Sequence, residues 1–67
     1  MLTFRQFIFD YCKSNNLIPN NVPNDTFIDI TEKDCNLSFP KRKDVITFRC
    51  NKAKLTFTRV GNYLTCN

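Results

Sequence analysis

The chain of 67 residues has no histidine, no tryptophan, a single glycine and no long apolar run. Without histidine there is no Ser-His or Cys-His pair and no imidazole general base. A single glycine, Gly61, excludes a glycine-rich phosphate-binding loop. Because a membrane-spanning helix needs about 20 apolar residues, the sequence predicts no membrane segment. We therefore expect a protein that is not an enzyme and does not cross a membrane.

The cysteines are too far apart for a compact metal site. The closest pair is separated by fifteen positions and no Cys-x-x-Cys motif occurs, so we expect no metal site and no cofactor. The first ten residues are mostly apolar, but they include Arg5, Gln6 and Asp10, which is not typical of a secretory signal. We therefore expect a cytoplasmic protein with free thiols at four positions: Cys12, Cys35, Cys50 and Cys66.

Length and composition predict one small domain, residues 1–67. A chain of this size buries only about 60% of its unfolded surface, so its core is thin, and a second copy would add stability. Asparagine, lysine, isoleucine and phenylalanine are abundant, whereas Ala53 and Gly61 are the only residues of their types. The abundant residues have AT-rich codons. This bias and the small size favour an origin in a phage, a virus or a mobile element, with the host cytoplasm as the site of action.

Residues 3–14 carry the pattern of an amphipathic helix. Thr3 is placed to cap the helix N-terminus, and Gln6, three residues later, completes a capping box. Phe9 lies about 100° away from the apolar stripe of this helix. It either covers a loop or is an exposed aromatic anchor for a partner. The stripe itself is formed by apolar side chains spaced three and four apart: Phe4, Phe7, Ile8, Tyr11 and Cys12.

The last third of the chain predicts a β-meander of three antiparallel strands, at about 45–50, 55–60 and 63–67. Alternation gives these strands one apolar face, on which the helix packs, and one face that is mostly threonine. The apolar face is formed by Ile46, Phe48, Cys50, Leu55, Phe57, Leu64 and Cys66. The opposite face carries Val45, Thr47, Arg49, Thr56, Thr58, Val60, Tyr63 and Thr65.

Turn lengths predict how these strands pair. A Gly-Asn pair between Val60 and Tyr63 is a two-residue hairpin turn, which places these two residues opposite each other. A four-residue loop at 51–54 would place Phe48 opposite Phe57.

The predicted register limits disulfide formation. Cys50 and Cys66 would lie on strands separated by the middle one, about 10 Å apart, which is too far for a bridge. If a disulfide forms, it would join Cys12 to Cys50 or to Cys66; otherwise these thiols line the core.

The remaining segments are predicted as connections, except for one short strand. Residues 15–25, rich in asparagine and proline, are expected to be irregular, residues 26–30 are a strand candidate, and residues 31–43 are a second connection. The predicted fold class is therefore α+β: an N-terminal amphipathic helix packed on a small antiparallel sheet of three or four strands.

Charge is divided unequally along the chain. Residues 1–34 contain three basic and five acidic residues, a balance of −2, whereas residues 35–67 contain seven basic residues and Asp44, a balance of +6. The basic half coincides with the predicted meander, so we expect a positive surface that attracts an acidic partner. The basic residues are Lys41, Arg42, Lys43, Arg49, Lys52, Lys54 and Arg59.

Two functions fit this pattern. The first is a non-enzymatic binding protein that modulates or inhibits a host or defence protein by occupying an acidic surface, with the basic residues, Tyr63 and Phe9 in contact. The alternative is a nucleic-acid-binding domain that holds single-stranded DNA or RNA on the outer sheet face, where Arg49 and Tyr63 lie. Exposed edge strands at 45–50 or 63–67 are expected to extend a partner's sheet or to pair two copies into a homodimer.

Overall fold

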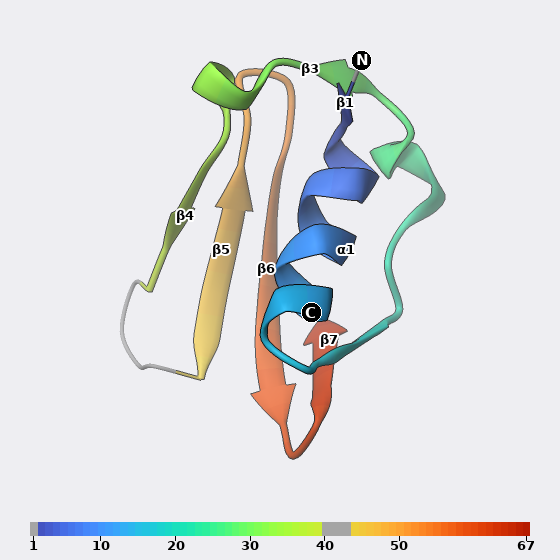
Figure 1. Ribbon diagram of the computed structural model, residues 1–67, viewed down its shortest axis with the longest axis vertical. Helices are drawn as coiled ribbons and strands as arrows, with labels where there is room; N and C mark the ends of the chain where they lie inside the picture. Colours follow the sequence, from blue (N-terminus) through green and yellow to red (C-terminus); the bar gives the residue numbers. More distant parts are fainter. Residues whose placement is uncertain (1, 40–43) are drawn as a thin grey trace.

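The computed structural model describes residues 2–39 and 44–67, in which one helix lies across one face of a five-stranded sheet (Figure 1). The helix, α1, spans Phe4–Ser14. The strand order of the sheet is β2-β7-β6-β5-β4, and a separate two-stranded pair joins β1 to β3. The predicted α+β class is confirmed. The strands are β1 (Leu2–Thr3), β2 (Ile18–Asn20), β3 (Asp29–Ile30), β4 (Asn36–Ser38), β5 (Val45–Arg49), β6 (Lys54–Val60) and β7 (Tyr63–Cys66).

The start of α1 is fixed by the predicted capping box. The Thr3 hydroxyl accepts a hydrogen bond from the backbone N–H of Gln6 at 3.1 Å, and the Gln6 side-chain oxygen accepts one from the Thr3 N–H at 2.9 Å. Both bonds satisfy N–H groups that a helix N-terminus otherwise leaves unpaired. The predicted stripe is also confirmed, because Phe4, Ile8 and Cys12 are buried.

The end of α1 is a Schellman motif that turns the chain towards the sheet. Asn16 adopts a positive φ of 57°, a conformation that asparagine tolerates better than most residues. The Leu17 N–H donates to the Cys12 carbonyl at 2.8 Å, and the Asn16 N–H donates to the Lys13 carbonyl at 3.3 Å. Leu17 is itself buried, so it anchors the chain just before β2 begins.

The core lies between α1 and the sheet and is centred on Phe48. This side chain is fully buried, and three rings meet it edge to face: Phe7 at 6.0 Å, Tyr11 at 5.4 Å and Phe57 at 5.2 Å between centroids. Each such pair adds about 0.5–1.5 kcal/mol to the free energy of burial. The helix and the meander are therefore joined mainly through one aromatic cluster.

The predicted β6–β7 hairpin is confirmed. Val60 pairs with Tyr63 and Thr58 pairs with Thr65. Gly61 has a φ of +61°, which an L side chain adopts only with strain, so the turn requires this residue.

The predicted β5–β6 register is wrong by two residues. Phe48 pairs with Leu55, not with Phe57, and Arg49 pairs with Lys54. The loop closes earlier than predicted because the Cys50 N–H donates to the Ala53 carbonyl at 2.9 Å. A shift of two residues leaves every side chain on the same face, so the predicted division into an apolar and a threonine-rich face still holds.

The predicted sheet of three or four antiparallel strands is incomplete. The segments predicted as connections each supply one three-residue strand: β2 pairs parallel with β7, and β4 pairs antiparallel with β5. The strand predicted at 26–30 is wrong in its first part, because Asn24–Thr26 is a 3₁₀ helix and only Asp29–Ile30 is extended. Such short strands carry too few residues to show alternation and form only where a neighbouring strand offers backbone partners.

Candidate functional site

The sheet face turned away from α1, here called the outer face, is the candidate binding surface. In the described part of the chain no helix or strand packs over it, whereas α1 covers the other face (Figure 1). Its centre is uncharged: the Thr47 and Thr56 hydroxyls approach to 3.4 Å, and Thr47 is buried by its neighbours. The threonines that occupy this centre lie on three adjacent strands: Thr47, Thr56, Thr58 and Thr65.

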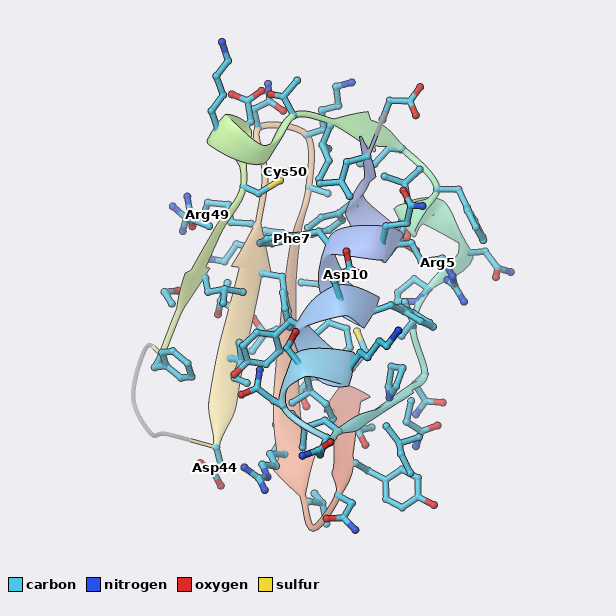
Figure 2. All side chains as sticks on the ribbon, in the orientation of Figure 1. Arg5, Phe7, Asp10, Asp44, Arg49 and Cys50 are labelled. Atoms are coloured by element: carbon cyan, nitrogen blue, oxygen red, sulfur yellow. The ribbon has the colours of Figure 1, made fainter. Side chains whose placement is uncertain are left out.

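The two ends of the outer face differ in chemistry. At one end Arg49 of β5 and Lys54 of β6 lie directly opposite each other. Figure 2 shows Arg49 reaching away from the helix, beside β4. Both side chains are exposed, and neither makes a hydrogen bond or an ion pair with another residue of 2–39 or 44–67. Two adjacent cations without a direct ionic partner in the described residues make this end of the outer face locally basic.

The other end carries a row of exposed apolar side chains. Ile18 of β2 pairs with Tyr63 of β7, which pairs with Val60 of β6. Their exposed fractions are 50%, 49% and 65%. Along β6, Val60 of this row is six positions from Lys54 of the basic end, a distance of about 20 Å at 3.3 Å per residue. Arg49 and Tyr63 thus share one face, as predicted, but lie at its opposite ends.

Two other predicted basic residues, Lys52 and Arg59, make contacts away from the Arg49–Lys54 pair. The Lys52 ammonium donates to the Asp29 carbonyl at 2.8 Å and so fastens the β5–β6 turn to β3. The Arg59 Nε donates to the Gly61 carbonyl at 3.1 Å. Arg59 lies opposite Leu64 on the face that α1 covers. The predicted sites Lys41, Arg42 and Lys43 lie outside the described residues.

Phe9, the predicted aromatic anchor, is far from the outer face. It lies on α1 and remains exposed over 37% of its surface. Its ring lies 4.9 Å from the Arg5 guanidinium carbon. The structure therefore separates Phe9 from the other predicted contact residues.

The edge strands are not those that the sequence predicted. β5 is covered by β4 and β7 by β2, so the predicted edges at 45–50 and 63–67 are wrong. The true edges are the short strands β2 and β4. Pro19 removes a backbone donor from β2, which makes that edge a poor template for pairing. β4 is the edge on which a further strand would pair.

The four cysteines form no disulfide in the described residues, and they pack in or against the core. Burial raises the pKa of the Cys12 thiol. Burial, with a smaller contribution from the negative charge of Asp25, raises the pKa of the Cys66 thiol. Both groups therefore stay protonated at neutral pH. In the described residues no three His, Cys, Asp or Glu side chains gather as a metal site would require.

These thiols predict a loss of stability at alkaline pH. A folded-state pKa above the unfolded value of about 8.5 stabilises the fold at lower pH, and this contribution is lost as pH rises through the folded-state pKa. We expect the melting temperature to fall between neutral pH and pH ~10, and to fall less in a Cys12→Ala, Cys66→Ala variant. Equal slopes for the two proteins would show that other groups set the alkaline limit.

Comparison of the chain with protein-family models, with curated proteins and with solved structures finds no match. Within the described residues, no helix combines the length and the apolar character needed to cross a bilayer.

Sequence reasoning missed one member of the candidate site, Ile18. Its segment was predicted as irregular, and a single isoleucine before a proline gives no strand signal. Only the parallel pairing with β7 places Ile18 beside Tyr63.

Proposed function

We propose that this chain is a non-enzymatic binding protein that docks its outer face on an acidic surface of another protein. The observation that carries the proposal is the pairing of Arg49 with Lys54 on a face that also exposes Tyr63. Exposed cations steer the approach of an acidic partner. An exposed aromatic residue with apolar neighbours supplies the kind of contact from which interfaces draw most of their binding energy.

The partner we propose is a host or defence protein, which the chain inhibits or modulates in the cytoplasm. AT-rich residue usage and small size support a phage, viral or mobile-element origin. Small viral and phage proteins commonly act by covering a surface of a host protein. β4 offers an edge for pairing with a second copy, and we propose a homodimer through this edge as the arrangement that would enlarge the thin core.

Charge reversal on the outer face tests the docking proposal. The variant Arg49→Glu, Lys54→Glu changes the net charge by −4 without removing a described contact. The matched control Lys13→Glu, Lys33→Glu makes the same change at exposed residues outside the outer face.

Tagged wild-type, outer-face and control proteins would be used to capture partners from host lysate, with quantification by mass spectrometry. We expect a partner that the wild type and the control retain and that the outer-face variant loses by about tenfold or more. A loss of that size corresponds to about 1.4 kcal/mol, close to the lower end of the ~1.5–7 kcal/mol measured for close charge pairs at interfaces. Equal capture by all three proteins would refute docking through this face.

A second candidate is single-stranded nucleic acid on the same face. The observation in its favour is that Tyr63 shares a face with Arg49 and Lys54, so one base could stack while two cations contact phosphates. Against it, Tyr63 is the only aromatic residue on the described outer face, fewer than a stacking platform usually has. If this candidate is right, Tyr63→Ala should weaken oligonucleotide binding by ~1–3 kcal/mol.

A further inference from the structure

A second surface, formed by α1 and the segment before β3, contains an arginine held between two exposed phenylalanines. The guanidinium carbon of Arg5 lies 4.9 Å from the Phe9 ring centroid and 4.7 Å from that of Phe27. Phe27 is 66% exposed, so most of its apolar surface is open to a ligand. Figure 2 shows Arg5 on the flank of the molecule opposite β4. This flank is separate from the outer face.

The Arg5 side chain is fixed in one orientation. One of its terminal nitrogens, Nη1, donates to the Pro23 carbonyl at 3.2 Å and to the Thr26 hydroxyl at 3.1 Å. Thr26 is buried, and its own hydroxyl donates to the Pro23 carbonyl at 2.8 Å. Because the Arg5 side chain is already held in one orientation, it loses less conformational entropy when a ligand binds.

The remaining donors of Arg5 have no partner in the described chain. Neither Nε nor Nη2 makes a hydrogen bond or an ion pair with another residue of 2–39 or 44–67. These two nitrogens form the side of the guanidinium that binds a carboxylate through two parallel hydrogen bonds.

The groove around Arg5 favours a ligand that accepts hydrogen bonds. Arg5, Phe9 and Phe27 line an open groove of about 380 Å³ together with Thr3 and Gln6. The side-chain oxygen of Gln6 already accepts from Thr3 in the capping box, which leaves the Gln6 NH₂ group as a further donor. The groove therefore offers donors and two phenyl faces.

We propose that this groove binds a peptide segment of another protein in which a carboxylate stands beside an aromatic or aliphatic side chain. The carboxylate pairs with the free side of the Arg5 guanidinium, and the apolar side chain packs on Phe27 or Phe9. The inference is independent of the outer face, because no groove residue belongs to the five-stranded sheet.

The test uses two short peptides, acetyl-Leu-Glu-Phe-amide and acetyl-Leu-Gln-Phe-amide, which differ only in the charge of the central residue. Each is titrated into ¹⁵N-labelled protein while the Arg5 Nε–H and the backbone amides of Phe9 and Phe27 are followed by NMR. We expect saturable shifts at these groups and a Kd about tenfold lower for the glutamate peptide, as a charge-assisted hydrogen bond implies. Equal Kd values, shifts centred elsewhere, or no shift with either peptide would overturn the proposal.

Variants separate the two halves of the site. Arg5→Gln should abolish the difference between the peptides, whereas Lys13→Gln, which removes the same charge from an exposed position of α1, should preserve it. Phe27→Ala should weaken both peptides equally and keep their ratio. If Arg5→Gln does not fold, the ratio of the two peptide Kd values in the wild type and in Phe27→Ala still tests the proposal. Concentration-dependent shifts at the groove without peptide would indicate self-association and would also overturn it.

Discussion

Replacing Phe48 with alanine is expected to lower the free energy of unfolding by ~3–5 kcal/mol. At roughly 0.05–0.15 kcal/mol per residue, a chain of this length has only ~3–10 kcal/mol in total, so the change removes most of its stability. The physical reason is position: Phe48 is fully buried and is the ring through which Phe7, Tyr11 and Phe57 meet. Urea denaturation followed by circular dichroism measures the effect.

Phe39→Ala is the matched control for this prediction. The same side chain is removed, but Phe39 is 52% exposed at the end of β4, so the loss should stay below ~1 kcal/mol. If Phe48→Ala cost no more than Phe39→Ala, the aromatic cluster would not be the centre of the core.

Replacing Tyr63 with alanine is expected to weaken partner binding by ~2 kcal/mol or more, which is about thirtyfold, and to change stability by less than ~1 kcal/mol. The effects on binding and on stability differ because Tyr63 is only half-buried and its neighbours on the outer face, Ile18 and Val60, are exposed as well. Isothermal titration of the captured partner measures binding, and thermal melting measures stability.

Phe39→Ala again serves as the control, since it removes an exposed aromatic residue from another part of the surface. Its affinity for the partner should equal that of the wild type. A Tyr63→Ala protein that binds as tightly as Phe39→Ala would exclude the apolar row from the interface.

The elements that the sequence predicted correctly are those specified by local contacts. Thr3 and Gln6 are three residues apart and cap the helix by themselves, and Gly61 specifies the hairpin turn in the same local way. The side-chain stripe of α1 follows from helical periodicity alone. In each case the interacting residues are close in sequence, so the local sequence pattern is sufficient to predict the element.

The parts that were mispredicted depend on distant partners or on backbone geometry. The β5–β6 register depends on where the turn closes, and the sequence between Cys50 and Lys54 has no glycine to mark that point. β2 forms because the chain leaves α1 through a positive φ at Asn16, and an asparagine followed by the apolar Leu17 is a signal that could have predicted this turn.

The outer face and the Arg5 groove also differ in how far the sequence alone predicts them. Arg49 and Tyr63 could be assigned to one face from alternation, but the stacking of Arg5 on Phe27 joins residues 22 positions apart and has no local signature. Arg5 and Phe9, four residues apart on a helix, are neighbours that the sequence does indicate.

The most direct test of the central claim, that the outer face binds an acidic protein, is to measure binding of the purified protein to labelled single- and double-stranded DNA and RNA across a salt series. Phosphate contacts would give a binding constant whose logarithm falls linearly with the logarithm of the salt concentration. We predict no specific binding even at low salt, which leaves the Arg49–Lys54 pair to an acidic protein partner. Tight binding with a steep salt slope would contradict the account and make nucleic acid the ligand of this face.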